Sequence, residues 1–223
     1  MSDEAVLFER KDPGIAILTL NRPDKRNAVS IELCHALACA FDEALKNPKV
    51  GAILIDAKGP VFSAGMDLDE VLQPDAAPKT YIHEKIFTIG ARSHRRIVAA
   101  VQGPALGGGL GLVANAHVAI AAQGSSFGLT EIRIAMWPFV IFRSIKAVVG
   151  ERRAVELSLT GRIFNTPEAL QWGFIHEVAP AIELDDRATA MANQLAESSS
   201  EAISTGLEFV HAARDANPVL FGK

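Results

Sequence analysis

The sequence predicts an α/β protein, because apolar runs of strand length alternate along the chain with segments that have the amphipathic pattern of helices. Two of these runs, residues 50–57 and 96–103, are apolar almost throughout, as expected for strands that are covered on both faces of a sheet. Each is followed by a loop that contains glycine. Open α/β sheets commonly bind ligands in the loops that follow their strands, so the same pattern predicts where a site should lie.

The other elements are expected in a regular order along the chain. Residues 14–20 alternate in polarity and are rich in Ile and Leu, which predicts the first strand. Ser30 provides the hydroxyl of an N-cap, so a helix is expected to continue from it to residue 47. Residues 68–80 are polar, contain two prolines and predict a mobile loop. A further strand is expected at 117–122, and helices are expected at 81–95, 139–149, 151–159, 167–172 and 185–214.

The composition limits the classes of partner. Of the 223 residues, 49% are apolar and 22% are charged, and the net charge is -4, so there is no excess of positive charge for nucleic acid or an anionic membrane. No apolar run has the length of a membrane span. The N-terminal segment MSDEAVLFERKDP is polar and has no signal-peptide pattern. We therefore expect a cytoplasmic protein.

Neither cysteines nor histidines predict a metal site. Cys34 and Cys39 stand five residues apart in one expected helix and point in different directions, so we expect no disulfide between them. The six histidines are dispersed along the chain without the spacing of metal ligands.

The run PALGGGLGLVAN contains three successive glycines, Gly107 to Gly109, and a fourth at Gly111. One interpretation is close packing of a helix against a sheet. The other is a strand-to-helix turn whose main-chain N–H groups bind a developing oxyanion. The run matches neither the G-x-G-x-x-G dinucleotide motif nor a phosphate-binding loop. An oxyanion site would need a second donor, and the loop FSAGMD at 62–67 is a natural source of it.

Taken in order, these stretches resemble the crotonase superfamily, the enoyl-CoA hydratase/isomerase family. The resemblance covers about residues 6 to 210. It is carried by NRPDKRNAV at 21–29, FSAGMD, VAAVQGPALGGGLGL at 98–112, SFGLTEIRI at 126–134, and GERRAVELSLTGRIFNTPEALQWGFIHEVAP at 150–180. Each motif is weak alone, and the ordered set is highly specific.

The resemblance implies a fold, a ligand and roles for particular residues. The fold would be a spiral of ββα turns with a helical C-terminal part, assembled as a trimer or hexamer. The ligand would be an acyl-CoA thioester, with coenzyme A as part of the substrate and no other cofactor. The N–H groups of Met66 and Gly108 would form the oxyanion hole. The coenzyme would be received by Arg26, Asn27, Ala28 and Ala64.

The resemblance also implies a division of the chain. Residues 1–184 would form the spiral core. Residues 185–223 would form the helical C-terminal segment, which is expected to be shorter than is usual in the family.

One of the family's catalytic residues has no counterpart here. Hydratases of the family use two glutamates, and the first of them would stand at the position of Gly111. The second corresponds to Glu131. A single carboxylate can take a proton from the carbon next to the thioester and return it two carbons along. The family's 3-enoyl-CoA isomerases, which also lack the first glutamate, work in this way, so we expect Glu131 to be the sole acid and base of such an isomerase.

An apolar pocket would raise the pKa of Glu131 toward its working range. The alternative role for this residue is a structural ion pair with Arg133 or another cation. The stretch Trp137-Pro138-Phe139 also resembles a Pro-Phe pair of the mitochondrial isomerases. Six nearby apolar residues are expected to form the pocket, namely Ile132, Ile134, Met136, Trp137, Phe139 and Phe142.

Two other functions within the family stay open. One is a hydratase in which Glu131 works with an ordered water or with a group that the sequence does not identify, and the other is an acyl-CoA-binding member without chemistry. The family's dehalogenases have a tryptophan at the position of Glu131 and an aspartate at that of Phe139, so this chain does not match them.

Overall fold

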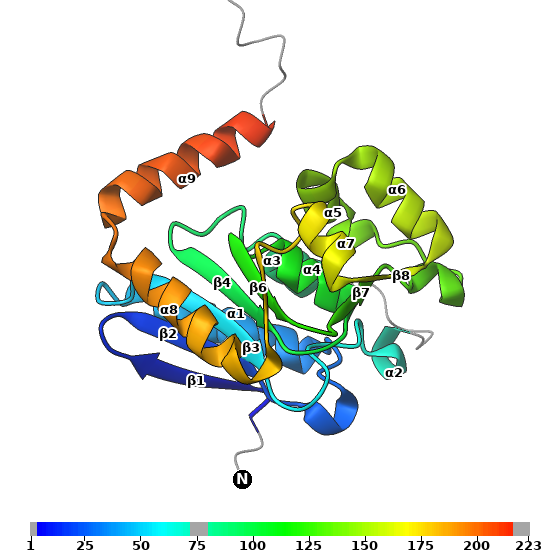
Figure 1. Cartoon of the computed structure of the whole chain (residues 1–223), viewed down its shortest axis with the longest axis horizontal. Helices are drawn as coiled ribbons and strands as arrows, with labels where there is room; N and C mark the ends of the chain where they lie inside the picture. Colours follow the sequence, from blue (N-terminus) through cyan, green and yellow to red (C-terminus); the bar gives the residue numbers. More distant parts are fainter. Residues whose placement is uncertain (1–3, 72–79, 216–223) are drawn as a thin grey trace, which may run out of the picture.

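The computed structural model describes residues 4–71 and 80–215 and contains two sheets surrounded by helices (Figure 1). The first sheet has six strands in the order β1-β2-β3-β4-β6-β9, and the second has three in the order β5-β7-β8. The strands are β1 (Val6–Lys11), β2 (Ile15–Leu20), β3 (Ala52–Ala57), β4 (Arg96–Val101), β5 (Ala105–Leu106), β6 (Val118–Ala122), β7 (Ser126–Gly128), β8 (Ile163–Asn165) and β9 (Glu177–Ala179).

Helices occupy most of the chain between the strands, and none in the described ranges is both long and apolar enough to cross a membrane. The α-helices are α1 (Ile31–Lys46), α2 (Leu68–Val71), α3 (Thr80–Phe87), α4 (Gly108–Ala114), α5 (Phe139–Val149), α6 (Glu151–Thr160), α7 (Thr166–Gln171), α8 (Leu184–Glu197) and α9 (Ser200–Asp215). Short 3-10 turns cover Pro23–Lys25, Glu131–Ile134 and Ala181–Glu183.

The central strands are buried on both faces, which explains their uninterrupted apolar sequences. In β3, Ile53 and Ile55 face the larger core, while Ala52 and Leu54 face a smaller core that α8 covers. Because side chains alternate along a strand, each strand needs apolar residues at every position to fill both cores. Figure 1 shows α8 lying across one face of the sheet.

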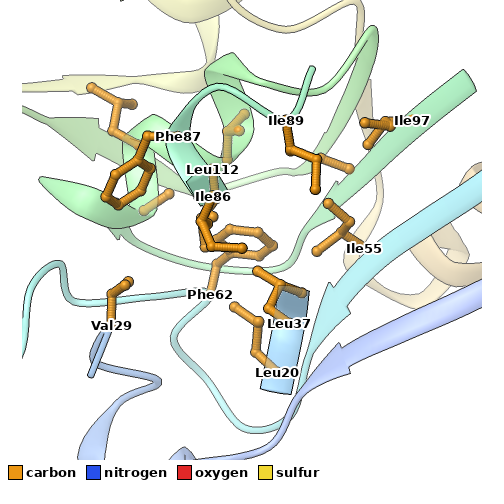
Figure 2. Packing of buried hydrophobic residues seen from close by; sticks show 14 of the residues in the cluster. Leu20, Val29, Leu37, Ile55, Phe62, Ile86, Phe87, Ile89, Ile97 and Leu112 are labelled. Carbon is orange, nitrogen blue, oxygen red and sulfur yellow. The ribbon is translucent and has the colours of Figure 1, made fainter. Parts of the chain in front are cut away.

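The larger core lies on the opposite face of the sheet from α8. Figure 2 shows Leu20, Ile55 and Ile97 of three strands near Leu37 of α1 and Ile86 of α3. This packing holds the ends of β3 and β4, and the loops that leave those ends lead toward the candidate site.

The second sheet is built from the segments that follow the strands of the first. Ala105 and Leu106 pair in parallel with Phe127 and Gly128, and β7 pairs antiparallel with β8. The chain therefore passes from the first sheet into the second after both β4 and β6. This repetition produces successive turns of strand, strand and helix.

Two histidines support the sheet in the same way. The His117 N–H donates to the Ile97 carbonyl over 2.8 Å, and its Nδ1 accepts from the Ile97 N–H over 2.9 Å. His176 repeats this with Ala119, over 2.8 Å and 3.1 Å. Each histidine immediately precedes a strand. Its ring nitrogen therefore accepts the hydrogen bond that the main-chain carbonyl of one more strand residue would otherwise accept.

A buried arginine joins the sheet to the last two helices. The guanidinium of Arg96 donates to the carbonyls of Gly51, Ser198 and Ser199, over 3.1, 2.9 and 3.0 Å. Beyond this junction, Figure 1 shows α9 standing away from the sheet.

Most expected elements are confirmed, with small shifts at their ends. The strands at 14–20, 50–57, 96–103 and 117–122 correspond to β2, β3, β4 and β6. The helix expected over 81–95 is wrong beyond Phe87, because Gly90 packs directly against the main chain of Asn115 and the chain turns there. The segment 185–214 is two helices divided at Ser198–Ser199. In the loop expected at 68–80, residues 68–71 form α2, and 72–79 lie outside the described residues.

Candidate functional site

Two loops that are far apart in sequence meet at the end of the first sheet. They are the loop 58–67 after β3 and the glycine run after β4. The Ser63 N–H donates to the Pro104 carbonyl over 3.2 Å, and the Leu106 N–H donates to the Ser63 carbonyl over 2.9 Å. Gly65 packs so closely that a β-carbon on it would stand 3.1 Å from the Leu106 carbonyl oxygen. The two loops therefore form one rigid surface.

The N–H groups of Met66 and Gly108 lie side by side on this surface. A β-carbon on Gly108 would stand 3.5 Å from the Met66 nitrogen. The Gly65 carbonyl accepts from the Val29 N–H over 2.7 Å, and since a trans peptide is planar, the Met66 N–H of the same peptide points away from Val29. Within residues 4–71 and 80–215, neither the Met66 N–H nor the Gly108 N–H donates a hydrogen bond.

Glu131 faces the glycine run from a third segment. It begins a 3-10 turn after β7, and its carboxylate lies over Gly107, where a β-carbon would stand 2.9 Å from Oε1. Gly107 has a φ of +47° and caps α4, so a glycine is suited to this position for two separate reasons. Gly107 stands within the predicted glycine run, but neither the motif nor the resemblance gave it a role of its own.

The Glu131 carboxylate is partly buried, and burial raises its pKa. Its Oε2 is buried and has no hydrogen-bond partner among the described residues. Arg133 does not pair with it and instead donates from Nη2 to the Gly161 carbonyl over 2.6 Å. The alternative in which Glu131 forms a structural ion pair with Arg133 is therefore wrong.

A cavity of about 110 Å³ brings these groups together. Met66, Gly107 and Glu131 all line it, so the carboxylate and the first of the two amides share one space. The other lining residues are Ala64, Gly65, Leu68, Thr130, Ile134 and Met136.

The expected apolar surroundings of Glu131 are only partly correct. Of the six residues expected, Ile134 and Met136 line the cavity. Ile132 and Phe139 do not line it, and Phe139 is 80% exposed. Trp137 and Phe142 stack on each other with ring centroids 5.9 Å apart. The cavity around Glu131 is therefore lined by Ile134 and Met136 together with the two loops.

The position of Gly111 is filled by hydrocarbon from neighbouring elements. A β-carbon there would stand 3.0 Å from Cβ of Ile141 and 3.1 Å from Cδ1 of Phe87. A longer side chain at this position would need both residues to move. No sequence signal identified Ile141, because the contact joins two helices.

The loop expected to receive the coenzyme lies against the FSAGMD loop. The Ala64 N–H donates to the Arg26 carbonyl over 2.9 Å, so Arg26, Ala28 and Ala64 are neighbours. The Arg26 side chain is exposed and available to a ligand. The Asn27 side chain is fully buried and serves the loop itself, since it donates to the carbonyls of Lys58 and Val61 and accepts from the Arg22 N–H. Any contact of Asn27 with a ligand must therefore use its main chain.

The described residues contain no group of three or more His, Cys, Asp or Glu side chains placed to hold a metal ion. The groups that the site itself presents are a carboxylate with a raised pKa and main-chain donors.

Comparisons with known proteins identify the family to which this chain is similar. The family model described as Enoyl-CoA hydratase/isomerase matches residues 10–219. A protein of Mycobacterium tuberculosis named as a probable enoyl-CoA hydratase is 33% identical over 96% of this chain and 83% of its own length. A 4-chlorobenzoyl coenzyme A dehalogenase of Arthrobacter is 33% identical over 87% of this chain and 73% of its own length. The crystal structure of an enoyl-CoA hydratase of Mycobacterium smegmatis superposes with a TM-score of 0.88 at 25% identity, covering 96% of this chain and 85% of that one.

Proposed function

This chain belongs to the enoyl-CoA hydratase/isomerase family and is an acyl-CoA enzyme, and we propose that it isomerises a 3-enoyl-CoA to a 2-enoyl-CoA. The observation that carries the proposal is the relation between Glu131 and Gly111. The Glu131 carboxylate shares a cavity with Met66, whose amide lies beside that of Gly108, and the position at which the family's hydratases hold their first glutamate is crowded by Ile141 and Phe87.

The reaction begins with the thioester oxygen between the N–H groups of Met66 and Gly108. Glu131 takes a proton from C2, and the electron pair of that C–H bond delocalises over the thioester and the C3–C4 double bond as a dienolate. Glu131 then returns the proton to C4, which leaves the double bond between C2 and C3. Proton and charge balance, because the carboxylate is regenerated.

The two amides supply the electrostatic part of catalysis. Negative charge develops on the thioester oxygen as the proton leaves, and donors already aimed at that oxygen stabilise it without reorganisation. Each such donor typically lowers a barrier by about 3 kcal/mol. Neither amide needs to break an existing hydrogen bond among the described residues before it binds the oxygen.

The raised pKa of Glu131 suits a group that must both accept and donate a proton. A carboxyl with an ordinary pKa is a weak base toward a carbon acid at neutral pH. Burial makes the ionised carboxylate less stable and therefore a stronger base. The protonated form is then stable enough to persist until C4 is protonated.

The proposal extends to the coenzyme and to assembly. The coenzyme end of the thioester lies along Arg26, Ala28 and Ala64, with the exposed Arg26 near its phosphates. The enzyme needs no cofactor besides the coenzyme A of its substrate, and it assembles as a homotrimer or hexamer. Light scattering would test the assembly.

Hydration is the second candidate, and the names of the relatives favour it. It requires a water held for attack at C3, and among the described residues that line the cavity only Glu131 has a side chain that could activate that water as a base. A member that binds acyl-CoA without chemistry is the third candidate, and it is favoured by Gly111 itself.

A panel of 2-enoyl and 3-enoyl thioesters distinguishes these candidates. The wild type should convert 3-enoyl-CoA with the appearance of conjugated absorbance, and Glu131→Gln should lose turnover by at least about a thousandfold while still binding the thioester. Glu43→Gln, which changes an exposed glutamate of α1, is the matched control and should retain full activity. Loss of the conjugated absorbance of 2-enoyl-CoA would show hydration instead. Binding without conversion of either substrate would show a non-catalytic member.

A further inference from the structure

The segment that carries Met66 is held by an ion pair that the mechanism does not use. Arg22 Nη1 lies 3.2 Å from Asp67 Oδ2 and donates over 2.8 Å to the Ala28 carbonyl. The two side chains are only 18% and 11% exposed, so water screens the pair weakly. A single guanidinium nitrogen with two hydrogens therefore joins two segments. One is the loop expected to receive the coenzyme, residues 21–29, which is called the coenzyme loop below, and the other is Asp67, the residue that follows Met66.

The peptides on both sides of Met66 are anchored, one through Gly65 and the other through Asp67. The Asp67 N–H donates to the Val29 carbonyl over 3.1 Å, and its Oδ1 accepts from the Asp69 N–H over 3.2 Å. Together with the bond from the Val29 N–H to the Gly65 carbonyl, these contacts hold the peptides on both sides of Met66. Met66 itself makes no hydrogen bond through its N–H within the described residues, so its direction depends on these neighbours.

We propose that Arg22 and Asp67 are positioning residues that aim the Met66 N–H at the thioester oxygen. The inference rests on the proposed function, because the proposed function is what gives the oxyanion site its purpose. It also makes the coenzyme loop and the oxyanion site one mechanical unit. Ala64, which binds the Arg26 carbonyl, and Ala28, which accepts from Arg22, belong to the same unit.

A second ion pair between the same two segments provides a comparison. Lys25 Nζ lies 3.6 Å from Asp69 Oδ2, but these side chains are 55% and 84% exposed. Exposed pairs of this kind contribute little to stability or geometry. Asp69→Asn therefore removes a charge from the same loop without disturbing the buried pair, which makes it the matched control for Asp67→Asn.

The buried pair also explains why arginine is needed at position 22. The planar guanidinium presents fixed donors to the Ala28 carbonyl and the Asp67 carboxylate at once. A lysine keeps the charge but has a single flexible ammonium. Arg22→Lys should thus preserve folding better than an apolar substitution while loosening the direction of the Met66 N–H.

The experiment combines kinetics with a direct reading of the thioester carbonyl. Turnover of 3-enoyl-CoA is measured for wild type, Asp67→Asn, Arg22→Lys, the double variant and Asp69→Asn. The infrared carbonyl stretch is recorded for bound butyryl-CoA labelled with ¹³C at the thioester carbon, a saturated ligand that cannot react. Thermal unfolding of each variant is followed in parallel.

We expect kcat to fall about tenfold to a hundredfold in Asp67→Asn and Arg22→Lys, with KM changing less than about threefold. The double variant should be little worse than either single one. The carbonyl stretch, shifted to lower frequency in the wild type, should move back toward its value in water. Asp69→Asn should stay within about twofold of wild type in kcat and keep the full shift.

The outcomes separate this inference from the proposed function. A wild type that neither converts 3-enoyl-CoA nor shifts the carbonyl stretch would contradict the proposed function before any variant is compared. Suppose instead that the wild type converts 3-enoyl-CoA and shifts the carbonyl stretch. If Asp67→Asn and Arg22→Lys then keep its kcat and its carbonyl shift, the positioning role alone is overturned. Should Asp67→Asn fail to fold, Arg22→Lys decides the question.

Discussion

Gly111 lies so close to Ile141 that a β-carbon on Gly111 would stand 3.0 Å from Cβ of Ile141. Contacts of this length are tighter than well-packed cores accept, so the absence of a side chain at position 111 is built into the packing of α4 against α5. The missing carboxylate is therefore not a vacancy that a single substitution could refill.

Gly111→Glu should destabilise the protein and should not create hydratase activity. The new side chain meets Ile141 and Phe87, and overpacking of this kind typically costs about 1–3 kcal/mol, with the burial of a carboxylate added to it. Thermal unfolding and the loss of 2-enoyl-CoA absorbance measure the two effects. The control is Gly111→Glu combined with Ile141→Ala, which opens space for the carboxylate. Greater stability of the single variant than of the wild type would contradict this account of the packing.

Gly107→Ala should reduce activity more than its effect on folding explains. The positive φ of Gly107 strains any residue that has a β-carbon, and here the β-carbon would also push against the Glu131 carboxylate. Gly124 has a φ of +87° with nothing within 4 Å of a β-carbon, so Gly124→Ala is the matched control. Both variants should lose similar stability, while kcat should fall only in Gly107→Ala. Equal kcat values in the two variants would rule out the contact as the cause.

The stability of the protein should depend on pH through Glu131. Burial raises the pKa of Glu131 in the folded state. The stability that the protonated carboxyl contributes is therefore fully present below the unfolded pKa, about 4.3, and is lost as the pH rises through the folded pKa. Glu131→Gln cannot ionise and should therefore unfold at a higher temperature than wild type at pH 8. The difference should shrink as the pH is lowered toward 4. A Tm difference that does not change with pH would contradict the raised pKa.

Activity should follow the opposite trend, because the base is the ionised carboxylate. The value of kcat/KM for 3-enoyl-CoA should rise with pH through the raised pKa of Glu131 and then level off. The measurement is a pH-rate profile on substrate well below KM. If kcat/KM already stops rising at a pH near the ordinary pKa of glutamate, another group limits the rate.

His117→Ala should destabilise the sheet by about 1–3 kcal/mol, because the Ile97 N–H would be left without its acceptor in a buried position. His176→Ala removes the same kind of bond from Ala119, but that histidine is exposed and water can replace its ring. Urea unfolding of both variants gives the comparison. A larger loss for His176→Ala than for His117→Ala would be inconsistent with this explanation.

The sequence was most informative where burial alone determines structure. The strands β3 and β4 were predicted because they are apolar on both faces, and β2 was predicted from its alternation and its content of Ile and Leu. The strands β5, β7, β8 and β9 have two or three residues each, and they exist only because distant segments pair with them, as Ala105 does with Phe127. A local pattern cannot reveal such pairing. The end of α3 depends in the same way on contact between Gly90 and Asn115.

The candidate site shows the same division. Motif resemblance selected Met66, Gly108 and Glu131, and the structure brings these three residues together. The contact between Gly111 and Ile141 and the ion pair between Arg22 and Asp67 join positions 30 and 45 residues apart, so they became visible only in three dimensions. Asn27 lies in the expected loop, but the motif could not show that its amide serves the loop itself.

The two donors assigned to the thioester oxygen belong to the main chain, so no replacement of the Met66 side chain other than proline deletes the first of them. Side chains at this position are therefore free to vary for the fit of different acyl groups while the polarising element is inherited unchanged. Only an amide-to-ester replacement, introduced by chemical synthesis or an expanded genetic code, would remove a single donor and leave every side chain in place.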